Sequence, residues 1–399
     1  AILVLVNPGD EVIVPAPYWV SYPEMVKLAE GKPVIVTAGI EQDFKITPAQ
    51  LEAAITPKTK ALILCSPSNP TGSVYSKEEL AGLVAVLAKH PQVIVIADEI
   101  YEHINYIGKH QSIAQFPEMK DRTVIVNGVS KAYAMTGWRI GFIAGPEWIV
   151  KASNKLQGQY TSGPCSVSQK AAEAAYTGTQ APVEEMRKAF ERRRDLIVKL
   201  AKEVPGFEVN VPEGAFYLFP KCSSFFGKSA GDRKIENSDD LAMYLLEVGH
   251  VACVGGTSFG APECIRMSYA TSDENIVEAM RRIKETLARL KTSPSAVGVF
   301  GLGFYDQNRD RLRVATVNNV APSENTILNG SYPVSRPLFF YVKGEHLKSI
   351  KGLPEFTEYF LSKKVSGKGS KLDKAGLISM SDKERAQVLA NFKAGKAVK

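Results

Sequence analysis

Four short runs of Val, Ile and Leu, each ending in polar or conformationally special residues, constrain the fold of this chain most strongly. They read DEVIVPAPYW, KALILCSPSNPTG, QVIVIADEIY and RTVIVNGVSK, at residues 10–19, 60–72, 92–101 and 122–131. Each run is short enough for a strand buried on both faces, and helical patterns separate the runs. This alternation is typical of a parallel sheet with crossover helices. We therefore predict an α/β large domain with a mostly parallel sheet over residues 1–181.

The residues that end these runs are the first candidates for a functional site. Ligands of open α/β sheets bind outside the carboxyl ends of the strands, so side chains placed there converge on one crevice. The candidates are Trp19, Asn69, Asp98, Tyr101, Ser130 and Lys131.

Residues 182–291 predict a smaller α+β domain. Apolar residues recur at near-helical spacing over residues 183–204 and 271–290, and Thr271 with Glu274 forms a capping-box pattern at the start of the second helix. Between the helices, FEVNVPEGAFYLFP at residues 207–220 alternates like an antiparallel strand pair.

Composition excludes several classes of protein. No apolar run reaches the roughly 18 residues that a membrane helix needs. The five cysteines are odd in number and lack C-x-x-C spacing, which indicates reduced thiols in the cytoplasm and neither a disulfide framework nor a metal site. The chain opens on Ala1 within an apolar run, so we expect its natural start, with any targeting signal, to lie upstream.

The positive charge is concentrated in the last part of the chain. Residues 292–399 carry 17 Lys and Arg against 9 Asp and Glu, whereas the preceding residues are close to neutral. A basic segment can bind nucleic acid, but SKKVSGKGSKLDK has no interleaved aromatic residues. We interpret the segment as a solvated surface and assign it no nucleic-acid role.

Lys131 and Asp98 indicate a specific chemistry when they are taken together. An amine is nucleophilic only when neutral, and burial beside a second cation such as Arg139 lowers the pKa of a lysine. An acid at a strand end is what a pyridine nitrogen needs to stay protonated. Taken singly, each of these residues also has an ordinary structural explanation. These explanations are a surface lysine for Lys131, a helix cap for Asp98, a turn for Asn69 and a core position for Trp19.

The motifs resemble those of the class I, fold-type I aminotransferases that depend on pyridoxal phosphate. The stretch S-K-x-x-x-M-T-G-W-R-x-G begins at Ser130, and N-P-T-G, D-E-x-Y and R-M-S-Y-A lie around it in the expected order. The resemblance covers residues 1–291 and is greatest to bacterial aspartate aminotransferases. It implies transamination between an amino acid, aspartate or glutamate, and a 2-oxo acid, in a homodimer.

The resemblance also implies catalytic roles. Lys131 forms a Schiff base with the cofactor and then shuttles a proton, and Asp98 pairs with the pyridinium nitrogen. Tyr101 and Asn69 donate hydrogen bonds to the ring hydroxyl.

Further residues are expected to bind cofactor or substrate on the same grounds. Trp19 stacks on the pyridine ring, while Ser130 and Arg139 hold the phosphate. Arg266 binds the α-carboxylate of the substrate in a bidentate fork, with Asn69 beside it.

Two departures from the family pattern are expected to matter. About a quarter of a complete member is missing before Ala1, including a helix start that cradles the phosphate, so affinity for the cofactor should fall. After ARLK, a Ser/Pro-rich joint at Thr292–Ser295 opens a segment of different composition.

Residues 292–399 resemble the carboxyl-terminal part of periplasmic phosphate-binding proteins of ABC transporters. The stretch NGSYPVSRPLFFYV, residues 329–342, carries most of that resemblance and implies a partial α/β tail. Three interpretations stay open: an aminotransferase with an appended segment, a non-catalytic chimeric or truncated chain, and the surviving tail of a phosphate-binding module. We favour the first.

Overall fold

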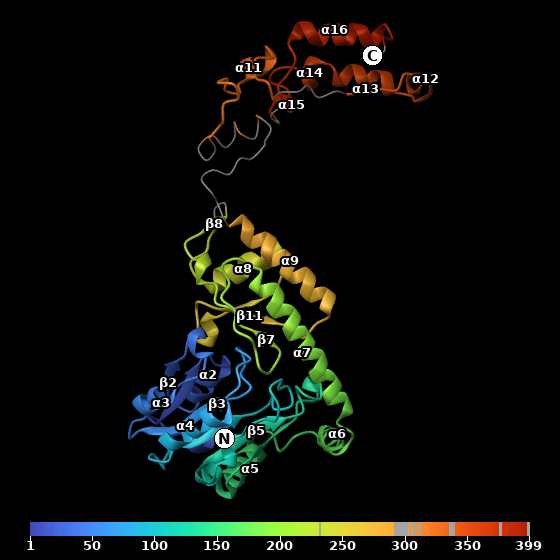
Figure 1. The fold of residues 1–399 in the computed structure, drawn as a ribbon. Helices are drawn as coiled ribbons and strands as arrows, with labels where there is room; N and C mark the ends of the chain where they lie inside the picture. The colour runs from blue at the N-terminus through green and yellow to red at the C-terminus, as the bar shows by residue number, and fades with distance from the viewer. Residues whose placement is uncertain are drawn as a thin grey trace. The chain divides into compact units, whose positions relative to one another are not determined.

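The computed structural model describes residues 1–230, 233–290, 302, 305, 309, 313–334, 340–374 and 377–396. The chain divides into two compact units, Ala1–Pro294 and Ser295–Lys399 (Figure 1). The division at 1–181, 182–291 and 292–399 stays a prediction, and the joint at Thr292–Ser295 lies outside the described residues. No helix among the described residues is long and apolar enough to cross a lipid bilayer.

A six-stranded sheet in the order β2-β1-β3-β4-β5-β6 forms the centre of the first unit. Neighbouring strands are parallel, except that β5 and β6 are antiparallel. The strands are β1 (Glu11–Ala16), β2 (Lys32–Thr37), β3 (Thr59–Cys65), β4 (Ile94–Asp98), β5 (Thr123–Gly128) and β6 (Gly141–Ala144). The predicted mostly parallel sheet is confirmed, and the four apolar runs are its four interior strands.

Alternate residues of these strands point to two separate cores. One face buries Val12, Val14, Ala61, Ile63, Ile94 and Ile96. The other face buries Ile13, Leu62, Leu64, Val95 and Ala97. Because successive side chains of a strand point to opposite faces, a continuous apolar run is what a sheet covered on both sides requires.

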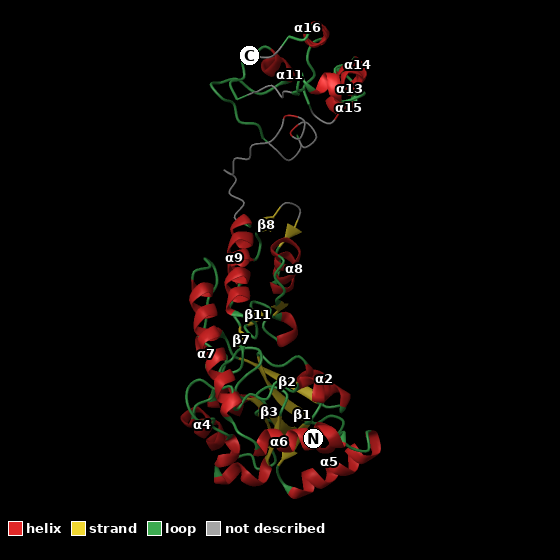
Figure 2. Cartoon of the chain, turned by 90° about the vertical axis from the view of Figure 1, so that its right-hand side faces the viewer, coloured by secondary structure: helices red, strands yellow, loops and turns green. Residues whose placement is uncertain are grey.

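Helices cover both faces of this sheet (Figure 2). Residues of α1 (Ile2–Leu5), α2 (Ser21–Leu28) and α5 (Glu147–Tyr160) join the first core, and those of α3 (Pro48–Ala54) and α4 (Lys77–Leu87) join the second. Helix α6 (Ser166–Thr177) follows α5 in the chain. A capping box at Thr47 and another at Ser76 begin α3 and α4. Because β1, β3, β4 and β5 are parallel, their carboxyl ends lie along one edge of the sheet.

The following residues form a smaller α+β region with its own core. Helix α7 (Ala181–Lys202) packs against α9 (Asp273–Arg289), and α8 (Ser238–Gly249) packs against α9 as well (Figure 1). The small strands are β7 (Tyr217–Leu218), β8 (Ser229–Ala230), β9 (Arg233–Lys234), β10 (Val254–Gly255) and β11 (Ile265–Ser268). Strand β11 lies between β10 and β7 and is antiparallel to both.

Two local predictions for this region were wrong in detail. Residues 207–220 form β7 and two isolated antiparallel bridges, Glu208 with Lys221 and Gly214 with Asn105, not a strand pair, because Pro212 and Gly214 interrupt the first half. The side chain that caps α9 is Ser272, which accepts a hydrogen bond from the backbone of Asn275. Thr271 instead accepts a hydrogen bond from the Asn275 side chain.

The described residues of the second unit form helices and one isolated bridge, between Val317 and Val320. The helices are α11 (Glu324–Leu328), α12 (His346–Ser349), α13 (Leu353–Phe360), α14 (Lys363–Ser366), α15 (Lys371–Lys374) and α16 (Asp382–Lys393). The ring of Phe340 stacks on that of Phe360 with centroids 4.6 Å apart. Residues 335–339 of the NGSYPVSRPLFFYV stretch lie outside the described part.

Candidate active site

Lys131 follows β5 and lies half-buried at the carboxyl edge of the sheet. Its Nζ atom is 5.7 Å from the ring centre of Tyr101 and 5.9 Å from that of Phe216. Burial lowers the pKa of Lys131; the Asp98 carboxylate opposes this shift, and the positive charges of Arg266 and Arg139 add to it. The sequence prediction of a lysine with a lowered pKa therefore agrees with the geometry.

Asp98 ends strand β4 and its carboxyl group is held by two donors. The hydroxyl of Tyr22 donates a hydrogen bond to Oδ2 at a distance of 2.5 Å. The backbone N–H of Ile100 donates one to Oδ1 at a distance of 3.2 Å. Burial raises the pKa of Asp98, while these hydrogen bonds and the charge of Lys131 favour the ionised form. Tyr22 was not predicted as a site residue, although it stands one helical turn after Trp19.

Tyr101 lies behind Lys131 and is almost fully buried, with 2% of its surface exposed. Its hydroxyl is 2.9 Å from that of Tyr217 on β7. Burial raises the pKa of both tyrosines, so both stay protonated and can donate hydrogen bonds. This pair joins the large sheet to the smaller α+β region.

Arg266 on β11 reaches from the smaller region to Asn69, which follows β3. Its Nη1 atom donates to Oδ1 of Asn69 over 2.8 Å. The guanidinium lies 4.7 Å from the ring centres of both Tyr217 and Phe259. These rings stabilise a cation and fix the plane of the guanidinium. The positive charge of Arg266 adds to the effect of burial in lowering the pKa of Lys131.

The remaining predicted residues lie around this group. Trp19 is 36% exposed and packs edge-to-face on Tyr22 with ring centres 5.5 Å apart, so it reaches Asp98 through that residue. Ser130 is half-buried beside Lys131. Arg139 is exposed, has a φ of 52°, and donates from Nη1 to the Thr136 carbonyl over 2.7 Å. The structure thus brings Lys131, Asp98, Tyr101, Asn69 and Arg266 together most closely.

The sequence and the fold match a known family. The model of the class I and II aminotransferases matches residues 1–283. The aspartate/prephenate aminotransferase of Cereibacter sphaeroides is 52% identical over 293 residues, which cover 73% of each chain. The aspartate aminotransferase of Geobacillus stearothermophilus is 53% identical over 283 residues, 70% of each chain.

Solved structures agree with these relatives. The aspartate aminotransferase of Rhizobium meliloti matches with a TM-score of 0.70 at 45% identity, over 72% of this chain and 73% of that one. The Thermus thermophilus enzyme with maleate matches with a TM-score of 0.66 at 41% identity, over 71% and 72%.

The matches also show which part of the chain is shared with its relatives. The bifunctional aspartate and glutamate/aspartate-prephenate aminotransferase of Petunia hybrida is 50% identical over 297 residues, but these span only 62% of its length. A model of the PBP superfamily domain matches residues 263–364, which supports the resemblance of the tail and overlaps β11 and α9. Over its first 283 residues, the chain belongs to the class I and II aminotransferases, a family that depends on pyridoxal phosphate.

Proposed function

We propose that this chain binds pyridoxal phosphate and catalyses transamination between aspartate or glutamate and a 2-oxo acid. The observation that carries the proposal is the position of Lys131 just after β5, beside Asp98 at the end of the neighbouring strand β4, where burial lowers the pKa of the amine. The relatives at about 50% identity, named as aspartate aminotransferases, support the substrate class.

The residues present fit this cofactor. Pyridoxal phosphate supplies an aldehyde that condenses with amines and a protonated ring that accepts an electron pair. Lys131 offers an amine whose pKa is lowered, and Asp98 offers a carboxylate at the neighbouring strand end. Tyr101 and Asn69 can donate hydrogen bonds to the ring hydroxyl, Trp19 can cover the ring, and Ser130 with Arg139 can bind the phosphate.

Lys131 is the group that moves the proton in this proposal. A general base works best when its pKa lies near the working pH, and burial brings the amine closer to that condition. The hydrogen bonds from Tyr22 and the Ile100 N–H oppose the rise that burial causes in the pKa of Asp98, and so favour the ionised form that pairs with a protonated ring. Tyr101 and Phe216 limit the approach of water to the amine from their side.

Arg266 is the group that selects the substrate. A guanidinium binds a carboxylate through two parallel N–H donors, and Tyr217 and Phe259 hold this one in place. Its bond to Asn69 keeps one donor occupied until a substrate carboxylate replaces the amide oxygen. The α-carboxylate of an amino acid is therefore drawn toward the Lys131 side of the site.

The test adds pyridoxal phosphate to the purified chain and follows visible absorbance, then measures formation of oxaloacetate from aspartate and 2-oxoglutarate. We expect a cofactor band that Lys131→Ala abolishes, together with the activity. Lys151→Ala is the matched control, since Lys151 is an exposed lysine paired with Glu147 on α5. A band that persists in Lys131→Ala contradicts the proposal; phosphate binding without any band supports the tail as a phosphate-binding module instead.

We also infer that the chain forms a homodimer. Large apolar side chains are exposed on β6, α5 and α6, among them Phe142, Trp148, Tyr160 and Tyr176. Phe142 and Tyr176 contact each other, with ring centres 5.8 Å apart. An exposed aromatic surface of this kind is typical of a protein interface. Sedimentation equilibrium should give twice the chain mass, and Phe142→Asp should shift the chain toward the monomer.

A further inference from the structure

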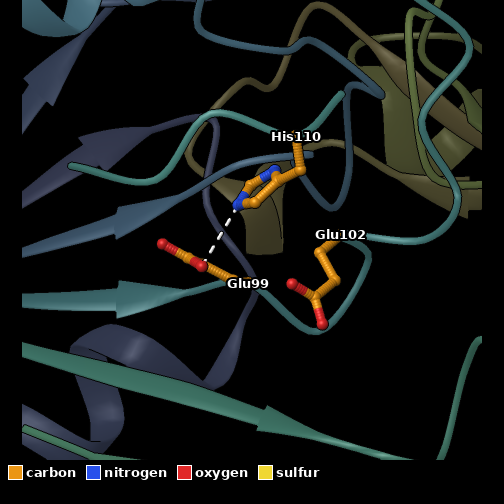
Figure 3. Close-up of side chains that lie close together, drawn as sticks. All are labelled: Glu99, Glu102 and His110. Atoms are coloured by element: carbon orange, nitrogen blue, oxygen red, sulfur yellow. Dashed lines mark ion pairs between the residues drawn. The ribbon is translucent and has the colours of Figure 1, made fainter. Parts of the chain in front are cut away.

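A second group of chemically reactive side chains lies in the connection between β4 and the short helix η2 (Ile113–Gln115). Glu99, Glu102 and His110 each offer one ligand atom, and these atoms lie within 4.8 Å of one another (Figure 3). None of the three is among the residues assigned to the cofactor or the substrate. The sequence did not predict a metal site here, because their spacing matches no common metal-binding motif.

His110 is the most unusual member of this cluster. Its side chain is only 11% exposed. Both ring nitrogens are buried, and neither makes a hydrogen bond. Nε2 lies 3.1 Å from Oε2 of Glu99, toward which the ring points in Figure 3, but the two atoms do not form a hydrogen bond. Buried polar atoms are nearly always satisfied, so this pair requires an explanation.

A shared cation explains the contact better than a hydrogen bond does. Imidazole nitrogens and carboxylate oxygens bind Zn²⁺ at about 2.0–2.2 Å. Two such ligands at an angle near 90–110° lie about 3 Å apart, as Nε2 of His110 and Oε2 of Glu99 do. Their lone pairs then converge on the ion instead of aligning along one N–H bond.

Another histidine of this chain shows what an ordinary pair looks like. Nε2 of His90 is also 3.1 Å from a glutamate oxygen, Oε1 of Glu52. That contact is a hydrogen bond, and its side chains are 26% and 42% exposed. It also has no part in the three-residue cluster. His90 and Glu52 therefore provide a matched control at the same distance.

We propose that Glu99, Glu102 and His110 bind one divalent metal ion of the Zn²⁺ type. One imidazole and two carboxylates form a ligand set that suits Zn²⁺ or Mn²⁺, whereas Mg²⁺ and Ca²⁺ prefer oxygen ligands alone. Three protein ligands leave further coordination positions for water.

The surroundings of Glu99 support a metal ligand. The hydroxyl of Ser112 donates to its Oε1 over 2.6 Å, which orients the carboxylate and leaves Oε2 directed at His110. The backbone N–H of Glu99 donates to Val126 at the end of β5. Outer hydrogen bonds of this kind fix the direction of metal ligands.

The ion would tie the connection between residues 99 and 112 to the sheet. His110 reaches back over eleven positions to Glu99, and Ser112 both contacts Glu99 and caps η2. A ligand that binds the folded chain alone stabilises it by mass action. The role of the metal is therefore structural, and its binding does not depend on the proposed transamination.

The experiment uses the untagged full chain, treated with a chelator and dialysed. Zn²⁺ is then titrated by calorimetry, and Co²⁺ is used as a spectroscopic substitute. We expect one Zn²⁺ per chain and a rise of a few degrees in Tm. His110→Gln and Glu102→Gln should each weaken Zn²⁺ binding at least about tenfold and remove the rise. His90→Gln should change neither.

Two controls keep the result decisive. Cys165 is exposed and could bind Zn²⁺ by itself, so the titration is repeated in Cys165→Ser, where the site must survive, and Co²⁺ must show no thiolate charge-transfer band. Circular dichroism verifies the fold of each variant; the Glu102 side chain is 28% exposed, more than that of Glu99 or His110, and its other partner is His103, with Nε2 3.2 Å from Oε1 of Glu102. Absence of stoichiometric binding, or equal affinity in Glu102→Gln and the parent chain, overturns the proposal.

Discussion

The hydroxyl of Tyr22 donates a hydrogen bond of 2.5 Å to Oδ2 of Asp98, and this contact ties the first turn of α2 to the end of β4. Tyr22 is buried, and burial raises its pKa well above the ordinary range, so it is a donor at any moderate pH. Because burial alone disfavours a charged carboxyl, the donor from α2 is a main support for the ionised form of Asp98.

Tyr22→Phe should therefore weaken both cofactor binding and the fold. Loss of the bond raises the pKa of Asp98 further, so a larger fraction of this acid is neutral and cannot pair with a protonated ring. We expect a loss of about tenfold in affinity for pyridoxal phosphate and of about 1–3 kcal/mol in stability. Absorbance titration and urea unfolding measure the two effects. Tyr18→Phe, in the same segment, is the control and should bind like the parent.

The pKa of Lys131 predicts a pH dependence for the reaction of its amine with an aldehyde. Burial lowers this pKa below the ordinary value of 10.5, so trapping of pyridoxal phosphate on Lys131 by borohydride should reach half its maximum below that pH. Arg266→Ala removes a positive charge that lowers the pKa and should shift the midpoint to higher pH. Mass spectrometry of the labelled peptide measures both. A midpoint that moves to lower pH would contradict the assignment.

The same lysine also affects stability in a predictable direction. Between its lowered pKa and 10.5 the unfolded chain binds more protons at Lys131 than the folded chain does. The contribution of Lys131 to the free energy of unfolding therefore rises with pH in this window. Urea unfolding of the parent and of Lys131→Met, compared over that range, should show the rise only in the parent.

Arg266→Lys should raise the KM for aspartate by about tenfold or more in the cofactor-loaded chain, because lysine cannot reproduce a two-donor fork. The cofactor band should remain. Arg192→Lys is the control, since Arg192 makes a two-donor contact with Asp273 on the surface of the smaller region. An unchanged KM in Arg266→Lys would falsify the role proposed for this residue.

The sequence predicted the interior of the large sheet better than its edges. Strands β1, β3, β4 and β5 are covered on both faces and read as continuous apolar runs. Strands β2 and β6 lie at the edges and are partly exposed, and neither was predicted, although β2 contains the apolar run Val34–Val36 and β6 is apolar but only four residues long. Site residues at the ends of interior strands were therefore visible in the sequence.

Site residues that are brought together only by the folding of the chain could not be identified from the sequence. Tyr22 stands on a helix, and its nearness to Asp98 follows from the packing of α2 on the sheet. Trp19 and Tyr22 share a helical spacing of three, which is the one signal that could have indicated it. The cluster around His110 forms because the connection after β4 folds back on itself. The spacing of its members in the sequence does not indicate this fold.

The cap of α9 offers a direct comparison between sequence pattern and structure. The pattern assigned Thr271, whereas Ser272 accepts the backbone hydrogen bond at the start of the helix. Ser272→Ala should cost about 0.5–2 kcal/mol in stability, and Thr271→Ala should cost less. Urea unfolding of both variants decides between the two residues. A larger loss in Thr271→Ala would favour the original capping box.

Residues 292–399 should be dispensable for the cofactor chemistry. The chain divides at Pro294 and Ser295, and the proposed site lies entirely in the first unit. The basic charge of the tail contrasts with the nearly neutral remainder, which indicates two surfaces of separate origin. Truncation after Lys291 should raise solubility and leave cofactor absorbance per folded chain unchanged. Loss of the band in a folded truncated chain would mean that the tail completes the site, and the two parts could no longer be treated as unrelated.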